Sequence, residues 1–461
     1  MIFLAPQQII LLLLPTFVKG IFLIFLQKEK SVKIQSMSQV TITTEKMVLG
    51  GDCIAKNEGK TIFLPYSLPE EKINVEIVEE KRDYSIAKIK EILEASPYRV
   101  KAPCPLYEKC GGCNMLHISN EYQRELKKIM VRDAFLREGI ELNIEDITCI
   151  SGSPLHYRSR FQFHNGGLME RQTNNVIPLT NCPMANPLIN KYLEEVPFED
   201  RPQGRYQIFA SEKITSIPQG FDKIIIAKDT ESQRSQKEKK SKEKKNVQYT
   251  PNGRKLPKQK KIKAQFAGTF SNQEDICTLE LNGEKITFDV QGFFQSNLEL
   301  LEKTIPLITE DIGGKNVLDM YSGCGTFSVF LKHKFENICL VEHNRGAIVY
   351  AEQNLNGFPH ESYGLSGQVW TQYHAENHIK QHGPFDAAIV DPPRSGMEKA
   401  VCKWLCSSGI PQIKSLSCDI ATHARDAKFL IRSGYKLKKI YLLDFYPGTS
   451  HIESLASFEK E

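Results

Sequence analysis

Hydrophobic and polar positions along this chain follow two different periods, and the change between them divides the sequence. From Val40 to Ile92 apolar residues alternate with polar ones, as in KINVEIVEE and YSIAKIKEIL, and turn residues separate these runs in LGGD and NEGK. Alternation with a period of two predicts half-buried β-strands. The pattern predicts a small β-barrel of the OB type, a scaffold that often binds nucleic acid along one face.

A helical period follows the barrel. Residues 119–139 carry apolar side chains at three- and four-residue spacing, and Ser119 or Asn120 can cap the start. This pattern predicts a helix, which we expect to pack on the catalytic domain. Short alternating segments return from about 155 to 290. From Lys315 onward the order is strand, turn and helix, which predicts a parallel α/β sheet.

These changes of period predict a chain of several regions, with an α/β fold as its main class. An apolar extension covers residues 1–36, the β-barrel covers 37–96, and a small central β domain covers 97–282. A Rossmann-like α/β domain is expected over 283–461. With 461 residues the chain is long enough to form several separate cores.

Composition changes this picture at one segment inside the central domain. Hydrophobic residues make up 41% and charged residues 25% of the chain, which are values of globular proteins. The net charge is +5, but residues 229–263 alone hold 13 Lys and Arg against 4 Asp and Glu. With almost no apolar side chains, this segment is predicted to be a flexible insertion, either a solvated loop or a tether for nucleic acid phosphates.

The first 27 residues, MIFLAPQQIILLLLPTFVKGIFLIFLQ, are apolar but interrupted by proline, glutamine and lysine. A signal peptide is disfavoured because no basic region precedes the apolar core. The stretch just reaches the roughly 20 residues of a membrane helix, so an anchor stays open as an alternative. We favour a third interpretation, in which the functional protein begins at Met37 and residues 1–36 come from a start codon assigned too far upstream. We expect the protein to be cytoplasmic.

A cofactor site is predicted where the parallel sheet begins. KNVLDMYSGCGTFSVFLK is typical of a buried strand over 317–319, a turn containing Gly323 and Gly325, and a helix. The next strand, in ICLVEHN, ends at Glu342, whose carboxylate can accept hydrogen bonds from both ribose hydroxyls of a nucleotide-like ligand. FDAAIVDPPRSG predicts another buried strand that ends at Asp391, at the edge of the sheet where ligands bind.

The residues around this turn favour one cofactor over another. A dinucleotide prefers a third glycine where this chain has Ser328, and its pyrophosphate would be repelled by Asp319. Asp319 instead suits the ammonium group of a methionine moiety. The sequence therefore favours S-adenosylmethionine over a nicotinamide cofactor.

Four cysteines have the spacing of a metal site. Cys104, Cys110 and Cys113 form a C-x5-C-x2-C pattern in APCPLYEKCGGCNMLH, and Cys182 follows in TNCPMAN. In a cytosolic chain this spacing favours metal ligation over disulfides. Four thiolates suit either zinc or a [4Fe–4S] cluster. Radical enzymes that use adenosylmethionine carry three closely spaced cysteines and an open iron, so a closed structural or RNA-shaping site is favoured here.

Cys418, in SLSCDIATHARD, lies between a predicted strand and a predicted helix start. Taken alone it is most simply a buried core residue. Eight motifs in order set it in a context: GGDCIAKNEGKTIFLPYSLPEE, CPLYEKCGGCNMLH, YRSRFQFH, GFFQSN, DMYSGCGTF, DPPRSG, SCDIATHARD and PGTSHIES. From about Met37 to the C-terminus this order resembles the RNA uracil-5 methyltransferases, and most of all the 23S ribosomal RNA group, which has a TRAM barrel and an iron–sulfur cluster.

The resemblance implies roles for ten residues. It implies Cys418 as the nucleophile and Glu453 as the base. Adenosylmethionine contacts are implied at Gln295, Tyr321, Glu342 and Asp391. A [4Fe–4S] cluster is implied on Cys104, Cys110, Cys113 and Cys182. It also implies a TRAM domain over 37–96, a cluster-bearing and RNA-binding domain over 97–282, and a methyltransferase domain over 283–461.

The expected partner is RNA, with 23S ribosomal RNA favoured, and we expect a monomer that does not act on DNA. Arg158 and Arg160 of YRSRFQFH are candidates for phosphate contacts, and His374 departs from the family, which usually has Asn or Asp there. Three alternatives stay open: a transfer RNA uridine or a cytosine as substrate, an amine methyltransferase suggested by DPPR, and a non-catalytic RNA-binding assembly factor.

Overall fold

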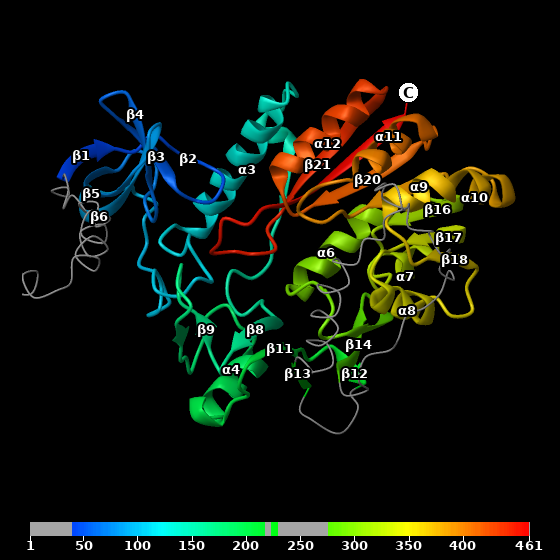
Figure 1. The fold of residues 1–461 in the computed structure, drawn as a ribbon, viewed down its shortest axis with the longest axis horizontal. Coiled ribbons are helices and arrows are strands. Elements are labelled where there is room, and N and C mark those ends of the chain that lie inside the picture. Colours follow the sequence, from blue (N-terminus) through cyan, green and yellow to red (C-terminus); the bar gives the residue numbers. More distant parts are fainter. Residues whose placement is uncertain (1–38, 217–222, 229–274, 461) are drawn as a thin grey trace, which may run out of the picture.

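The computed structural model describes residues 39–216, 223–228 and 275–460 (Figure 1). The apolar extension 1–36 and the Lys-rich insertion 229–263 lie outside the described residues. Among the helices described, we find none with the length and apolar character needed to cross a membrane.

A barrel-like sheet forms the N-terminal part of the described chain. It has six strands in the order β1-β5-β6-β4-β3-β2: β1 (Gln39–Thr43), β2 (Lys46–Met47), β3 (Cys53–Asn57), β4 (Lys60–Leu64), β5 (Lys72–Glu80) and β6 (Tyr84–Glu94). The strands β1 and β2 are two halves of one strand, since only Thr44 and Glu45 separate them. The first half pairs with β5 and the second with β3, so the sheet returns to its own first strand. This is the strand order of an OB-type barrel.

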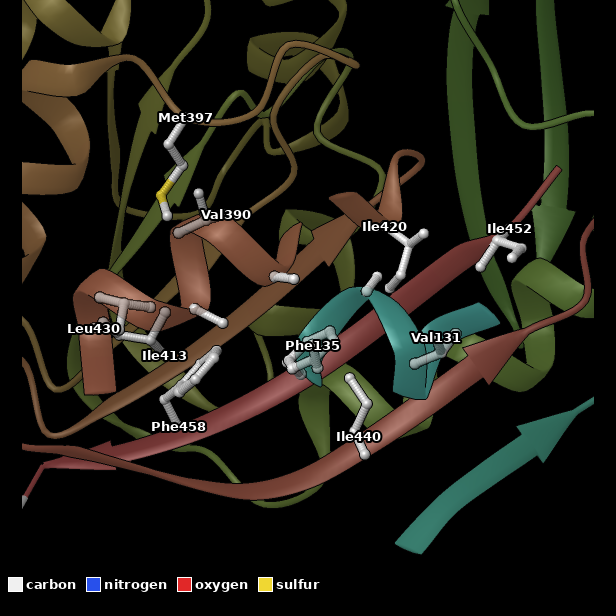
Figure 2. Packing of buried hydrophobic residues seen from close by; sticks show 14 of the residues in the cluster. Val131, Phe135, Val390, Met397, Ile413, Ile420, Leu430, Ile440, Ile452 and Phe458 are labelled. Atoms are coloured by element: carbon white, nitrogen blue, oxygen red, sulfur yellow. The ribbon is translucent and has the colours of Figure 1, made fainter. Parts of the chain in front are cut away.

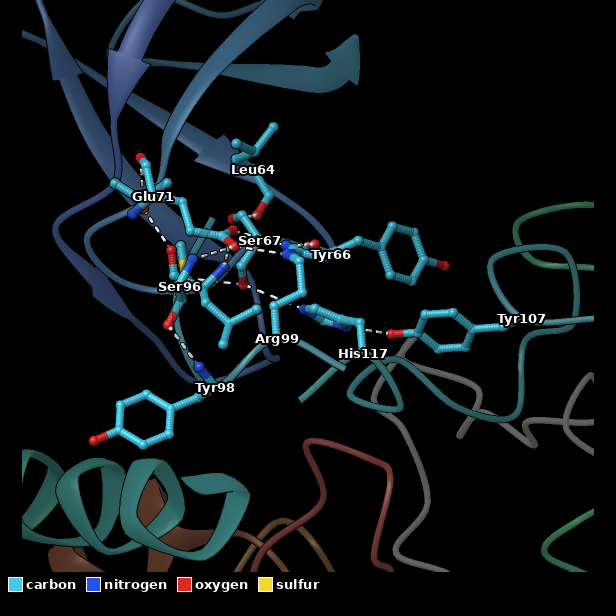
Figure 3. A network of polar contacts seen from close by, with 12 residues as sticks. Leu64, Tyr66, Ser67, Glu71, Ser96, Tyr98, Arg99, Tyr107 and His117 are labelled. Carbon is cyan, nitrogen blue, oxygen red and sulfur yellow. Dashed lines mark hydrogen bonds and ion pairs between the residues drawn. The ribbon is translucent and has the colours of Figure 1, made fainter. Parts of the chain in front are cut away.

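A buried carboxylate joins the barrel to the cysteine-bearing loop (Figure 3). The Glu71 side chain accepts hydrogen bonds from the backbone of Leu68 and Ser96 and from both Nε and Nη2 of Arg99, at 2.6 and 2.7 Å. Burial alone would raise the pKa of Glu71, but these hydrogen bonds hold it below its usual range. A buried carboxylate is tolerated when it is paired and hydrogen-bonded in this way.

His117 continues this connection toward the cysteines. Its Nε2 lies 3.4 Å from the carbonyl oxygen of Ser67 in the barrel, and its Nδ1 lies 2.6 Å from the hydroxyl of Tyr107. Tyr107 stands between Cys104 and Cys110, so the cysteine loop is held directly against the barrel (Figure 3).

The central part is built from short antiparallel strands. One sheet has the order β13-β11-β8, a second has the order β12-β14-β15, and β9 pairs with β10. Their bounds are β8 (Arg160–His164), β9 (Leu168–Met169), β10 (Val176–Ile177), β11 (Arg205–Ala210), β12 (Ile214–Ser216), β13 (Ile224–Lys228), β14 (Ile276–Leu281) and β15 (Glu284–Asp289). The helix α4 (Pro187–Glu195) packs on β11.

An eight-stranded sheet forms the C-terminal part, in the order β18-β17-β16-β19-β20-β22-β21-β7. Its strands are β7 (Ile147–Ile150), β16 (Gly314–Met320), β17 (Phe335–Val341), β18 (His360–Tyr363), β19 (Ala387–Val390), β20 (Gln412–Ser417), β21 (Tyr435–Leu443) and β22 (Glu453–Lys460). The strands from β18 to β20 are parallel, and β22 is antiparallel to both of its neighbours. The chain leaves β16 toward β17 and β18, then returns to β19 on its other side. This reversal of direction opens a crevice at the carboxyl ends of β16 and β19, where ligands bind in such folds.

Helices cover both faces of this sheet. On one face, residues of α6 (Leu298–Thr309), α7 (Ser328–Leu331) and α8 (Arg345–Asn354) share a core with the sheet. On the other face, α9 (Gly367–Tyr373), α10 (Ala375–His382), α11 (Lys399–Ser408) and α12 (Ile420–Arg432) share a second core. Neighbouring strand residues enter opposite cores, as Val317 and Leu318 do, which is the pattern of a doubly covered parallel sheet. This is the Rossmann-like α/β architecture expected from the sequence.

The helix α3 (Asn120–Arg137) lies between the barrel and the large sheet (Figure 1). Figure 2 shows Val131 and Phe135 of α3 packed among Ile420, Ile440 and Ile452 of the C-terminal part. On its other side, α3 receives an ion pair from Lys46 of the barrel through Asp133. Ser119 occupies the N-cap position, but its side chain makes no capping hydrogen bond.

Candidate active site

Four of the residues singled out in the sequence immediately follow neighbouring parallel strands. Glu342 follows β17, Tyr321 follows β16, Asp391 follows β19 and Cys418 follows β20. These strands are adjacent in the sheet in that same order. Since the carboxyl ends of parallel strands share one edge, the four side chains belong to one continuous edge of the sheet.

The turn after β20 is closed by hydrogen bonds on both sides of Cys418. The Ser417 hydroxyl donates to the carbonyl oxygen of Asp419 at 2.9 Å. The Asp419 side chain in turn caps α12 by accepting from the backbone N–H of Thr422 at 2.9 Å. Cys418 is thereby held at a fixed point between a buried strand and a capped helix, and its side chain is partly exposed.

Glu453 lies on the antiparallel neighbour of the strand that carries Cys418. The register of β20 and β22 pairs Ser417 with Ser454. One further step along both strands sets Cys418 opposite Glu453, and directly opposed residues have their Cβ atoms about 5 Å apart on one face. His423 of α12 supports this point of β22, with its Nδ1 2.7 Å from the Ser454 hydroxyl.

The charges of the site act on both of these side chains. Burial, together with the negative charges of Glu453 and Asp391, raises the pKa of the Cys418 thiol to about 11, while the charge of Arg394 opposes this shift. Burial also raises the pKa of Glu453 to about 8, with Asp391 adding to the shift and Arg394 opposing it. A base whose pKa lies near neutrality is well matched to proton transfer under physiological conditions.

Asp391, Asp319 and Glu342 form a second group of acidic side chains, whose negative charges raise the pKa of both aspartates. Burial raises the pKa of Asp391 to about 7, and the charges of Asp319 and Glu342 contribute. Burial likewise raises the pKa of Asp319 to about 7, against a hydrogen bond from Ser328. The side chain of Asp319 is buried within β16 and accepts a hydrogen bond from the Ser328 hydroxyl. The two residues that distinguished the cofactors in the sequence thus bind each other.

The turn after β16 leaves room for a ligand. Tyr321 has a left-handed backbone with φ of 67°, and Gly323 and Gly325 have φ of 57° and 77°. A Cβ at Gly323 would meet open space, whereas one at Gly325 would meet Ala351 at 3.1 Å. Glycine at the first position keeps the backbone accessible and at the second allows close packing of α8. The Glu342 carboxylate accepts from the Gly323 N–H at 3.1 Å and thereby braces the turn.

Two buried side-chain oxygen atoms, one of them in this turn, have no hydrogen-bond partner within the described protein. They are Oε1 of Gln295, in the loop before α6, and Oγ of Ser322, next to Tyr321. Unpaired buried polar atoms are costly, so they mark positions where a polar ligand is expected. Together with Glu342 and the open turn at Gly323, they fit S-adenosylmethionine, which brings an ammonium, a carboxylate and two ribose hydroxyls.

Arg394 is a residue that the sequence reasoning did not select. It follows Asp391-Pro392-Pro393, is exposed, and its charge acts on Cys418, Glu453 and His451 alike. The loop that carries it is fixed to α12, since the Thr422 hydroxyl donates to the Arg394 carbonyl oxygen at 3.2 Å. The sequence shows Arg394 as the arginine of DPPR, but only the fold shows that its charge acts on the Cys418 thiol.

The two arginines expected to contact RNA differ in their surroundings. Nη2 of Arg160 donates to the carbonyl oxygens of Val290 and Gly292, at 3.3 and 2.5 Å, which fixes the loop leading to Gln295. Arg160 is thus occupied within the protein. Arg158 lies 4.7 Å over the Phe161 ring and its charge reaches Cys113 and Tyr446, between the cysteines and the strand-end site.

The four cysteines gather in one place. The thiol of Cys113 is influenced by the charges of Cys182, Cys110 and Cys104, and Cys182 by those of Cys104 and Cys110. Three of them, Cys104, Cys113 and Cys182, border a small apolar cluster around Tyr157 and Met184. Two distant stretches of the chain are therefore brought together, and the metal site remains a prediction.

The cysteine loop also holds the loop that leads to Glu453. The backbone N–H groups of Asn114 and Met115 both donate to the carbonyl oxygen of Gly448. The Asn114 side chain accepts from the Ser450 N–H at 2.9 Å and donates to the Gly50 carbonyl oxygen of the barrel at 2.8 Å. One asparagine thus connects the barrel, the cysteine loop and the loop before β22.

Comparisons with known proteins agree with this geometry. The family model tRNA (Uracil-5-)-methyltransferase matches residues 375–461. An uncharacterized RNA methyltransferase of Treponema denticola is 36% identical over 92% of this chain and 100% of its own length. A 23S rRNA (uracil(1939)-C(5))-methyltransferase RlmD of Histophilus somni is 27% identical over 94% of this chain and 98% of its own.

A solved structure is similar over most of the fold. It is that of a Pyrococcus abyssi tRNA (uracil-54, C5)-methyltransferase in complex with S-adenosyl-L-homocysteine, with a TM-score of 0.64 and 22% identity, covering 91% of this chain and 100% of that one. With the relatives above, the chain therefore belongs to the RNA uracil-5 methyltransferase family, and it is an adenosylmethionine-dependent RNA (uracil-5-)-methyltransferase.

Proposed function

We propose that this enzyme methylates C5 of a uridine in 23S ribosomal RNA through a covalent bond between Cys418 and C6 of the base. The observation that carries the proposal is the position of Cys418 at the strand-end edge, beside Asp391 and opposite Glu453. The open turn at Gly323 and the unpaired oxygen of Ser322 at the same edge support a site for the methyl donor there.

Cys418 supplies the activation that uracil needs. C5 of uracil is too weak a nucleophile to accept a methyl group unaided. Addition of the thiolate to C6 forms a carbon–sulfur bond and gives C5 the character of an enolate carbon. Adenosylmethionine, when bound, supplies a sulfonium methyl group that this carbon can attack. A thiolate suits the step because it is strongly nucleophilic and can later leave by elimination.

Glu453 completes the reaction. Once C5 carries the methyl group it still holds its proton, and removal of that proton restores the double bond while the Cys418 sulfur leaves. Glu453 is expected opposite Cys418, one step beyond the Ser417–Ser454 pair, which favours it as the base that takes this proton.

The residues proposed to hold adenosylmethionine are Gln295, Tyr321, Glu342 and Asp391. Glu342 is placed for the ribose hydroxyls and Gln295 offers an unpaired buried oxygen. The target uridine must leave its stack to reach Cys418, so we expect a single-stranded or flipped substrate. Arg394, exposed beside the thiol, is available for an adjacent RNA phosphate.

We also propose that the four gathered cysteines hold a [4Fe–4S] cluster and that the N-terminal barrel is a TRAM domain. Four cysteine thiolates whose charges act on one another are the ligand set that a [4Fe–4S] cluster takes. The visible absorption of anaerobically purified protein, which is brown when iron–sulfur is bound, tests the metal.

A covalent trap tests the nucleophile. Fragments of 23S ribosomal RNA are transcribed with 5-fluorouridine and incubated with the protein and adenosylmethionine, then run on a denaturing gel. Fluorine at C5 blocks the final proton removal, so the adduct should persist as a shifted band, and Cys418→Ala should abolish it. Transfer RNA transcribed with 5-fluorouridine is tested in parallel. A shifted band with transfer RNA alone would identify transfer RNA as the substrate in place of 23S ribosomal RNA.

Other outcomes would overturn the proposal. Methyl transfer retained by Cys418→Ala would favour the direct route of amine methyltransferases, which needs no cysteine. Protein that holds its cluster and binds RNA, yet gives no band and no methyl transfer with either RNA, would favour a non-catalytic RNA-binding factor.

A further inference from the structure

A second group of ligating side chains lies at the edge of the large sheet opposite to Cys418. Glu361 stands near the start of β18, and His378 and His382 are one turn apart on α10. Nδ1 of His378 lies 2.8 Å from Glu361 Oε2, and Nε2 of His382 lies 3.3 Å from the same oxygen. Within 39–216, 223–228 and 275–460 this is the one group of three or more His, Cys, Asp or Glu whose ligand atoms all lie within 4.8 Å.

The group lines a hollow of about 230 Å³ at the amino ends of β16, β17 and β18. Asn316, Asn337 and His360 also contribute to its wall. The side chains of His382 and Glu361 are 40% and 32% exposed, which provides an entry path, while that of His378 is 5% exposed. A site with one buried and two accessible ligands is open to an ion from solution.

Neighbouring groups hold the histidines in place. The ring of His378 stacks between those of His382 and Phe385, with centroids 4.6 and 5.2 Å away. The Tyr363 hydroxyl lies 3.2 Å from Nδ1 of His378. These contacts restrict the rotation of the His378 ring before any ion binds. Two histidines at i and i+4 on one helix face also occur in known zinc sites.

We propose that Glu361, His378 and His382 bind a divalent transition-metal ion of the zinc type. Two imidazoles and one carboxylate suit zinc, cobalt or nickel and do not suit magnesium, which prefers oxygen ligands. The ion would fasten α10 to β18, and because the site lies at the amino edge of the sheet, it would stabilise the fold without entering the methylation chemistry.

Cobalt and zinc titrations of the full-length protein test the site. The protein is purified anaerobically so that its cysteines keep their own ligand, and bound metal per chain and the thermal midpoint are measured. We expect one additional ion per chain and a higher midpoint with Zn²⁺ or Co²⁺, and neither with Mg²⁺. In His382→Ala and Glu361→Gln the affinity should fall at least tenfold, with methyl transfer unchanged. His333→Ala is the matched control, because His333 forms an exposed pair with Glu284 and has no third ligand.

The colour of bound cobalt separates this site from the cysteines. Cobalt held by thiolates gives an intense sulfur-to-metal absorption that a histidine and carboxylate site lacks. Three results would overturn the proposal: no additional ion in the wild type at micromolar metal, equal binding in all variants, or the thiolate absorption as the sole cobalt signal. The first would leave the three side chains as an ion-paired cluster only.

Discussion

Cys418 and Glu453 stand opposite each other, one residue beyond the Ser417–Ser454 pair at the end of β20 and β22. The proposed base begins β22, and the proposed nucleophile directly follows β20 in a turn that hydrogen bonds hold in place. Asp391 raises the pKa of both side chains, and Arg394 lowers the pKa of both. The roles of the two residues can be distinguished by experiment.

Glu453→Gln should stop the reaction after methyl transfer. Without the carboxylate, the proton at C5 is not removed and the sulfur cannot leave. We expect turnover to fall by about 10²- to 10⁴-fold, while a protein–RNA adduct accumulates on a denaturing gel with ordinary uridine-containing RNA. The exposed Glu459 on the same strand supplies the control, because Glu459→Gln should turn over normally. Loss of turnover without any adduct would place Glu453 before the methyl transfer.

The ionisation of Cys418 should respond to Glu453. Burial and the nearby carboxylates raise the pKa of the thiol, so alkylation by iodoacetamide should be slow at pH 7 and accelerate toward pH 10. Near pH 9 most Glu453 is ionised, since its pKa is about 8. Glu453→Gln removes this negative charge, lowers the pKa of Cys418 and should speed alkylation there. Below pH 7, where Glu453 is protonated, the two proteins should converge.

Mass spectrometry of the peptide that contains Cys418 follows this modification among the twelve cysteines of the chain. Equal alkylation rates for wild type and Glu453→Gln across the whole pH range would show that the two side chains do not interact.

Asp391→Asn should stabilise the protein in a pH-dependent way. Burial raises the pKa of Asp391 to about 7, so between pH 4 and 7 the folded state holds a proton that the unfolded state has lost. The unfolding free energy therefore falls as pH rises through this window, because the buried carboxylate becomes ionised, and above the window the loss of stability is complete. Asparagine carries no charge, so the variant does not lose this stability. We expect a gain on the order of 1–3 kcal/mol at pH 8 and a smaller one at pH 5.

Thermal unfolding of both proteins at the two pH values measures the effect. An equal shift at pH 5 and pH 8 would mean that packing, and not the buried charge, is responsible. Because Asp391 is also a proposed adenosylmethionine contact, the more stable variant should bind the cofactor less well, as is common when a functional site is destabilising.

The strand-end residues after β17 and β19 could be predicted from their own pattern, whereas Glu453 was implied only by the resemblance to a family. The strands β17 and β19 end in apolar runs, ICLV and AAIV, so Glu342 and Asp391 are visible as the first polar positions after them. The hydrogen bond from Ser328 to Asp319 could not be predicted, because a sequence shows that an acid is near a strand end but not which side chain contacts it.

Long-range pairings explain the rest. Glu453 opposes Cys418 only because β22 inserts antiparallel beside β20 after a loop that the cysteine region holds in place. The spacing of His378 and His382 was readable, but their third partner, Glu361, comes from a separate strand. The barrel closes because β1 and β2 share one strand, a feature that alternation alone does not reveal.

Lys127 and Asp444 form a buried ion pair that supports the loop before β22. Their side chains are 0% and 4% exposed, and Nζ lies 2.6 Å from Oδ1. Nζ also donates to the carbonyl oxygen of Tyr446 at 3.2 Å. Lys127→Met leaves Asp444 as an unpaired buried charge, so the unfolding free energy should fall by about 3–5 kcal/mol.

The double variant Lys127→Met/Asp444→Asn removes the unpaired charge and should recover a large part of this loss. Denaturant unfolding of the wild type, both single variants and the double variant measures the coupling between the two side chains. Lys128→Met, at the next and less buried position of α3, is the control and should change stability little. If the loss of stability in the double variant equals the sum of the two single losses, the pair does not interact, and the loop is held by the Asn114 and Met115 hydrogen bonds to Gly448 instead.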